Sequence, residues 1–132
     1  MKFTPENIEA LEPNEVFVFG SNLAGIHGAG AAKLAYDRFG AKMGTGIGMM
    51  GKSYAIPTKD KNIKTLPLDS IKQWVKGFLM YAEIHPDKTF IVTKIGCGLA
   101  GYDSKDIAPF FKNFPTNVVL PKDFYDIIIS QY

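Results

Sequence analysis

The sequence has little of several features that would place the protein in other classes. It contains one cysteine, Cys97, among 132 residues, which excludes an intrachain disulfide and is typical of a reducing compartment. No apolar run approaches the roughly 20 residues of a transmembrane helix. The N-terminal stretch also lacks the apolar core of a secretory signal. These absences predict a cytoplasmic protein that does not contact a membrane.

Excess charge of one sign is also missing. The 15 Lys and Arg residues and 13 Asp and Glu residues leave a formal net charge of +2, which is too small to indicate direct binding of nucleic acid. Two histidines and one cysteine, widely spaced, form no metal-binding motif. We therefore expect neither a metal nor another resident cofactor.

Size and hydrophobic patterning indicate one folded unit, because 132 residues can bury a core and no linker interrupts them. Residues 1–132 are predicted to form a single domain. Strands are expected over 16–19, 53–56, 89–93 and 117–120, the second ending at Pro57. Helices are expected over 29–39, 69–83 and 104–114, and the ambiguous tail 123–131 is assigned to a helix. The alternation is typical of an α/β fold with a mostly parallel central sheet and helices on both faces.

Glycine is where the composition is unusual, because all 13 glycines lie between Gly20 and Gly101, mostly in three clusters. One cluster, Gly46 to Ser53, matches the phosphate-loop pattern G-x-x-x-x-G-K-S. That motif works only between a strand and a helix, whereas a predicted strand follows it here. We expect a flexible connection, and a P-loop nucleotide hydrolase is the lower-ranked alternative.

The other two glycine clusters each follow a strand and precede a helix. Residues 20–30 form a connection longer than the two to six residues usual for such a turn. Backbone N–H groups in a loop of this kind, together with the helix dipole, favour an anion. Residues 96–101 form the second loop. Loops after neighbouring parallel strands converge at one edge of the sheet, so the pair predicts a bound diphosphate or nucleotide.

Single residues within these segments leave alternatives open. Asn22 can hydrogen-bond a ribose or fix its own loop, and His27 is interpreted equally as a ligand contact or a turn histidine. Cys97, without a second sulfur or an acid–base pair, is more consistent with a small buried residue than with a nucleophile. Lys59 follows the second strand at its carboxyl end. Its spacing alone indicates an exposed lysine.

Taken together, these segments resemble the macrodomains, which are ADP-ribose-binding modules. The similarity is closest to the branch with the glutamate- and DNA-directed ADP-ribosyl hydrolases and covers about residues 15–115. It rests on Asn22 with the small-residue run 25–32, on the pair Thr58-Lys59, and on Ile95–Leu99, whose sequence I-G-C-G-L matches the family unaltered. The resemblance implies a three-layer α/β/α fold and a site for ADP-ribose, free or attached to a protein or nucleic acid.

The resemblance also implies roles for individual residues. Asn22 would contact the distal ribose, and Lys59 matches the lysine that attacks the anomeric carbon of that ribose in the glutamate-directed enzyme. The two glycine-rich loops would wrap the diphosphate from both sides. The expected ligand-binding residues are Ser21, Asn22, Gly25, His27, Gly28, Ala29, Gly30, Ala31, Thr58, Gly96, Cys97, Gly98, Leu99, Ala100, Gly101 and Tyr102.

Two positions depart from the family pattern. Ala100 stands where the glutamate-directed enzyme has an acidic residue, so Asp103, the nearest carboxylate, is the candidate second catalytic residue. Many macrodomains place an N-terminal aspartate against the adenine amine, and Glu15 is the candidate here. Binding of ADP-ribose is therefore ranked above its hydrolysis. The sequence is also consistent with a non-catalytic reader of ADP-ribose and with an interaction domain whose loops are vestigial.

Overall fold

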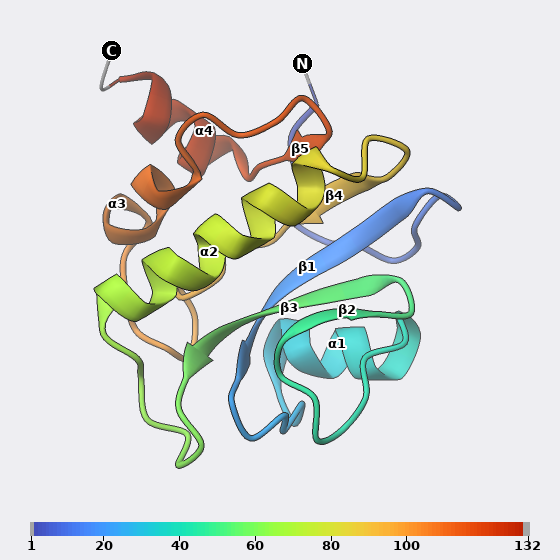
Figure 1. The fold of residues 1–132 in the computed structure, drawn as a ribbon, viewed down its shortest axis with the longest axis vertical. Helices are drawn as coiled ribbons and strands as arrows, with labels where there is room; N and C mark the ends of the chain where they lie inside the picture. The colour runs from blue at the N-terminus through green and yellow to red at the C-terminus, as the bar shows by residue number, and fades with distance from the viewer. Residues whose placement is uncertain (1, 131–132) are drawn as a thin grey trace.

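The computed structural model describes residues 2–130 as a mixed α/β protein (Figure 1). One sheet contains β1 (Glu15–Asn22), β2 (Gly48–Met50), β3 (Ser53–Lys59), β4 (Thr89–Val92) and β5 (Val118–Val119). The α-helices are α1 (Gly30–Arg38), α2 (Leu68–Glu83), α3 (Ser104–Ile107) and α4 (Lys122–Ile129), and a 3-10 helix, η1 (Ala108–Phe111), follows α3. None of these helices combines the length and the hydropathy needed to cross a membrane.

The strand β1 lies at the centre of the sheet, whose order is β2-β3-β1-β4-β5. It pairs in parallel with both β3 and β4, and β4 pairs in parallel with β5. Only β2 runs antiparallel, against β3. The chain passes from β1 to β3 on one side and then crosses to β4 on the other, so the loops after these strands gather at one edge of the sheet.

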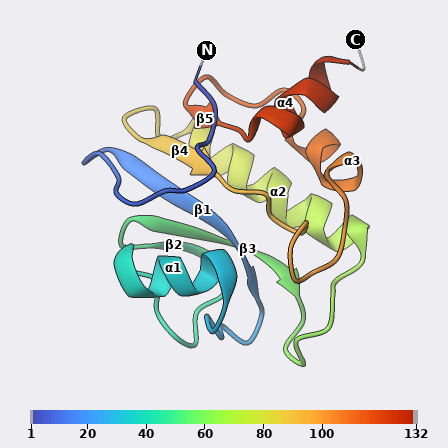
Figure 2. The ribbon, with the colours of Figure 1, turned by 180° about the vertical axis from the view of Figure 1, so that it is seen from behind.

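Each face of the sheet carries a core of its own, with helices on both sides (Figures 1 and 2). On one face, Phe17 and Phe19 of β1 pack with Ala35 of α1. On the other face, Val18 packs with Phe78 of α2 and residues of α4. Successive side chains of a strand point to opposite faces. This explains why β1 begins with a continuous apolar run, because both of its faces are buried.

Several predicted elements differ from the structure in extent. The strand β1 continues to Asn22, and β3 runs through Pro57 to Lys59, with a register shift between Ser21 and Asn22. The helix predicted over 104–114 is instead α3 followed by η1, because Pro109 cannot donate an α-helical hydrogen bond. The C-terminal helix predicted over 123–131 is confirmed as α4 for Lys122–Ile129, and position 131 lies outside the described residues.

The predicted flexible connection at 46–53 is wrong, because it contains β2 and a tight turn into β3. Gly51 adopts a φ of 56° in this two-residue turn. A phosphate loop needs a helix after its lysine, whereas β3 begins at Ser53. The ammonium of Lys52 donates instead to the carbonyl oxygens of Leu11 and Glu12, at 3.2 and 2.8 Å. The P-loop alternative is therefore contradicted.

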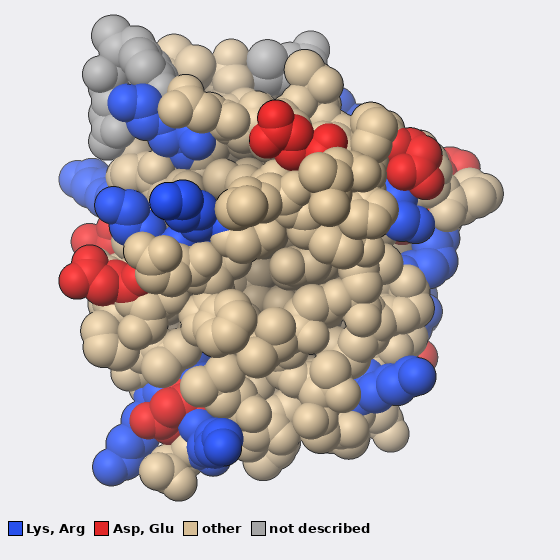
Figure 3. Space-filling view, in the orientation of Figure 1, with Lys and Arg blue, Asp and Glu red and all other residues tan. Residues whose placement is uncertain are grey.

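Charge is unevenly distributed over the face of the molecule drawn in Figure 3. Charged side chains gather towards its margins and leave much of its centre uncharged.

A glycine in α2 allows a first test of the fold. Gly77 lies exposed within α2, and a Cβ built there meets no atom within 4 Å. Alanine is favoured over glycine in an exposed helix by about 0.5–1 kcal/mol. We expect Gly77→Ala to raise the free energy of unfolding by this amount in urea titrations. A decrease would contradict the exposed position of Gly77.

Candidate functional site

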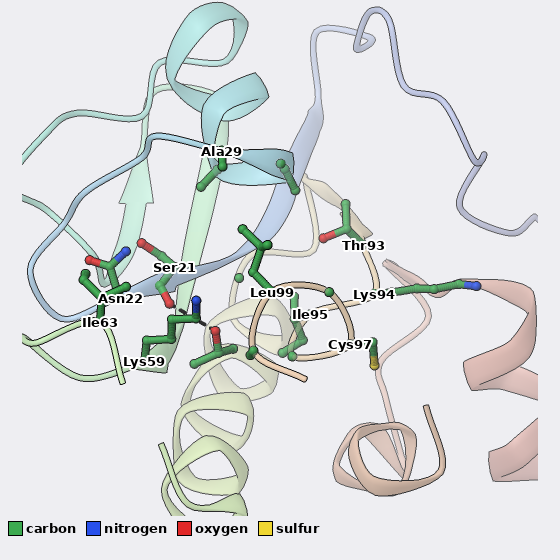
Figure 4. Close-up of a pocket in the computed structure, with 18 of the residues that line it drawn as sticks. Ser21, Asn22, Ala29, Lys59, Ile63, Thr93, Lys94, Ile95, Cys97 and Leu99 are labelled. Carbon is green, nitrogen blue, oxygen red and sulfur yellow. Dashed lines mark hydrogen bonds between the residues drawn. The ribbon is translucent and has the colours of Figure 1, made fainter. Parts of the chain in front are cut away.

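A cavity of about 590 Å³ lies at the carboxyl ends of β1, β3 and β4 (Figure 4). Its walls come from the last residues of β1 and β3 and from the connections that follow the three strands, as expected for parallel strands whose carboxyl ends lie together. Thirteen of the predicted site residues line it together: Ser21, Asn22, Gly28, Ala29, Gly30, Ala31, Thr58, Lys59, Gly96, Cys97, Gly98, Leu99 and Ala100.

Asn22 fixes the loop in which it lies. Its Nδ2 donates to the Ile26 carbonyl oxygen at 2.8 Å, and its Oδ1 accepts from the Ile26 N–H at 3.0 Å. The sequence left two roles open for Asn22, hydrogen-bonding a ribose or fixing its own loop. The structure shows the second role. A primary amide also has a second N–H and a second oxygen lone pair. Asn22 belongs to the lining of the cavity, although it is only 8% exposed.

His27 lies outside the lining of the cavity and is 1% exposed. Its Nε2 lies 2.8 Å from the Lys42 carbonyl oxygen and 2.9 Å from that of Thr45. Because both neighbours are acceptors, Nε2 carries the hydrogen. Its Nδ1 lies 3.4 Å from the hydroxyl of Ser21. The structure gives His27 the turn role, in which it joins the β1–α1 loop to the segment before β2.

Three other predicted ligand contacts also lie outside the lining: Gly25, Gly101 and Tyr102. Gly25 adopts a φ of 71° and packs so closely on Gly44 that a Cβ would lie 2.3 Å from its carbonyl carbon. The Tyr102 hydroxyl donates to the Leu66 carbonyl oxygen at 2.7 Å. These three residues determine the conformation of the loops, whereas other residues of the same loops line the cavity.

Asp103 lies at the start of α3 and does not line the cavity. Its N–H donates to the Asp106 carboxylate at 3.1 Å, in the arrangement of a capping box. Its side chain is exposed. None of the described residues lining the cavity carries a carboxylate, so the second catalytic residue expected from the sequence is not brought to Lys59.

Two lysines line the cavity, and they differ in their partners. The ammonium of Lys94 lies 3.2 Å from the Asp123 carboxylate and points towards α4 (Figure 4). Lys59 lies at the end of β3, in register with Asn22, and its side chain lies beside Ser21 and Asn22 in the close-up (Figure 4). Within residues 2–130 its ammonium forms no ion pair. Lys59 is therefore the free cation of this cavity among the described residues.

Cys97 lies half-buried in the cavity wall. Burial raises the pKa of its thiol above the ordinary value, and the hydrogen bond with Ser104 only partly offsets this effect. A raised pKa favours the thiol over the reactive thiolate. The sequence predicted a small buried residue rather than a nucleophile. Cys97 is only half-buried, and the raised pKa of its thiol disfavours the nucleophilic role.

The two glycine-rich loops present backbone donors at the cavity. The N–H groups of Gly98, Leu99 and Ala100 find no backbone acceptor among residues 2–130. The N–H groups in the first turn of α1 also lack intrahelical acceptors. Both sets belong to residues that line the cavity. Donors of this kind, with the positive end of the helix dipole, stabilise an anion.

A second cavity, of about 750 Å³, adjoins the first. The two share a wall made by Gly30, Ala31, Thr93 and Lys94. The N-terminal segment 4–8 and the start of α4 complete it. Glu15, the candidate adenine contact, lines neither cavity, because it lies at the opposite end of β1 and pairs with Lys2 at 2.8 Å. The structure therefore does not bring Glu15 to either cavity.

Some lining residues were missed by the sequence analysis. Thr93 and Lys94 directly follow β4 and line both cavities. The rule that ligands bind at the carboxyl ends of strands would have found them. Ile26 and Ile63 also line the first cavity. Ile26 lies within the loop 20–30 but was not among the expected contacts, and no motif marks Ile63.

No family model and no curated protein sequence matches the chain. A solved structure from Bacteroides thetaiotaomicron, described as that of a protein of unknown function, is similar with a TM-score of 0.60. The match covers 85% of this chain and 89% of that chain, with 16% sequence identity. At this identity the likeness shows a shared fold alone.

Proposed function

We propose that the protein is a macrodomain-like module, with a three-layer α/β/α fold, that binds ADP-ribose or a closely related nucleoside diphosphate. One observation carries the proposal. Two glycine-rich loops, which follow the neighbouring parallel strands β1 and β4, line one cavity and offer backbone N–H donors there. A diphosphate is the ligand group that such paired loops suit best, because its oxygens can accept hydrogen bonds from both sides.

The two adjoining cavities suggest how the rest of the ligand would lie. The shared wall includes Gly30 and Ala31 at the start of α1, so the diphosphate would lie there. The nucleoside would then extend into the second cavity. The terminal ribose would extend the other way, towards Asn22 and Lys59. A mononucleotide fills only part of this path, so we expect tighter binding of ADP-ribose than of AMP.

The proposal is tested by calorimetric titration with ADP-ribose, AMP and NAD. Gly98→Glu supplies the control, because a Cβ at Gly98 meets no atom within 4 Å and the fold should be retained. The new carboxylate would repel the diphosphate and fill its site. We expect the variant to lose at least about 100-fold in affinity for ADP-ribose. Absence of heat with all three ligands, or equal affinity in the variant, would contradict the proposal.

Hydrolysis of an ADP-ribosyl bond is the second candidate function, and the unpaired Lys59 supports it. The neutral amine would attack the anomeric carbon of the terminal ribose and form a C–N bond. The bond to the leaving group would break, and the amine proton would pass to water. Attack of water on the sugar carbon would then release ADP-ribose and restore the lysine. Since no carboxylate lines the cavity among the described residues, binding ranks above hydrolysis, and a non-catalytic reader of ADP-ribosylated macromolecules is the alternative.

A further inference from the structure

Three large aliphatic side chains in the lining of the first cavity are exposed. The exposed fractions are 53% for Ile26, 40% for Ile63 and 73% for Leu99. Apolar surface costs free energy in water, so a group of such side chains around a cavity is typical of a surface that a ligand covers.

Ile63 is also held in a backbone conformation that its side chain disfavours. Its φ is 62°, in the left-handed region that β-branched residues rarely adopt. The turn is fixed by Asp60, whose Oδ1 accepts from the N–H groups of Asn62 and Lys64 at 2.8 and 3.0 Å. The Asp60 N–H donates to the Lys64 carbonyl oxygen at 2.8 Å. Glycine would fit this position without strain, so the isoleucine side chain is retained at a cost in stability.

Hydrogen bonds join the loop of Ile63 to the loop of Leu99. The Thr65 hydroxyl donates to the Ala100 carbonyl oxygen at 2.9 Å. One residue further along the chain, the carbonyl oxygen of Leu66 accepts a hydrogen bond from the Tyr102 hydroxyl. Figure 4 shows Ile63 near Asn22 and Lys59, and Leu99 nearer to the centre of the view. The two side chains are therefore presented by one connected rim at the Lys59 end of the site.

We propose that Ile63 is a specificity-determining contact that packs, with Leu99, against the nonpolar face of the terminal ribose. This inference rests on the proposed function and adds the feature that separates ADP-ribose from ADP. Polar loops bind the diphosphate of both ligands equally. Only ADP-ribose places a second sugar under the rim, where its C–H face covers the exposed isoleucine and leucine. Backbone strain at Ile63 is the cost of presenting this side chain.

Titration of ADP-ribose and of ADP into the Ile63→Gly and Ile63→Asn variants tests the inference. Both replacements tolerate a positive φ, so we expect a melting temperature equal to or above that of the unaltered chain. Affinity for ADP-ribose should fall about tenfold, because the apolar contact is lost. Affinity for ADP should stay within about twofold. Asn113→Gly is the matched control, because Asn113 has a φ of 63° but lines neither cavity, and it should change neither affinity.

Each contrary outcome has a separate meaning. Unchanged affinity for ADP-ribose in both Ile63 variants would overturn the inference and leave the proposed function intact. An equal loss for ADP and ADP-ribose would also overturn it, because the loop would then act on the diphosphate. If the unaltered chain binds neither ligand, the proposed function itself fails, and the inference fails with it.

Discussion

Replacing Lys59 by alanine should abolish release of ADP-ribose from a modified peptide or oligonucleotide, while free ADP-ribose still binds. Lys59 lines the cavity and forms no ion pair among residues 2–130. If its amine is the nucleophile, its removal takes away the attacking group, because the other lysine of the lining, Lys94, pairs with Asp123. We expect kcat to fall at least about 1000-fold and the Kd for ADP-ribose to change less than about threefold. Product release under saturating substrate measures the first quantity, and calorimetry measures the second.

Lys61→Ala is the matched control for this experiment. Lys61 is exposed on the same connection and lines neither cavity, so its replacement removes one charge without touching the site. Turnover should be unchanged. Turnover by the Lys59→Ala variant at the unaltered rate would refute the hydrolytic role. If the unaltered chain binds ADP-ribose but releases none from the substrate, the protein is a non-catalytic reader and the hydrolytic role is excluded.

The second large effect is expected at Gly46. A Cβ at this position would lie 1.7 Å from the Asn22 carbonyl oxygen and 2.8 Å from the Asn22 carbonyl carbon. The same oxygen accepts the Gly25 N–H at 3.0 Å, so the obstacle is fixed backbone. We expect Gly46→Ala to lower the free energy of unfolding by about 3 kcal/mol or more. Urea denaturation measures the change.

Gly28→Ala provides the comparison for Gly46→Ala. Gly28 has an ordinary negative φ, and a Cβ built there meets no atom within 4 Å. Its replacement should change the free energy of unfolding by less than about 0.5 kcal/mol. If Gly46→Ala proves as stable as Gly28→Ala, the segment before β2 does not pack on the β1–α1 loop as described.

The sequence was most informative where burial and chain direction decide the structure. The apolar run 16–19 predicted the central strand, because a strand that is buried on both faces has apolar side chains at successive positions. The positions of the two long glycine loops predicted the shared cavity, because parallel strands place their carboxyl ends together. Both arguments depend only on local pattern and on a general rule of topology.

Features that depend on tertiary contacts were predicted less well. The strand β2 has three residues, two of them methionines, and forms by pairing with β3 more than by its own propensity. The glycines on either side of it, Gly46 and Gly51, therefore suggested a phosphate loop that the fold does not contain. The roles of Asp103 and His27 depend on where their side chains point, and this depends on helix capping and buried carbonyl groups. Neither the capping of a helix nor the position of a buried carbonyl group can be deduced from the spacing of residues in the sequence.

The wall common to the two cavities has a consequence for ligand design. Gly30, Ala31, Thr93 and Lys94 border both spaces, so two small fragments, one in each cavity, would lie close enough to be joined by a short linker. Joining them makes the second contact intramolecular and raises its effective concentration. A neutral linked compound could then compete with the diphosphate ligand proposed above without reproducing its phosphates. Weak fragment hits in either cavity would be useful starting points for such a compound.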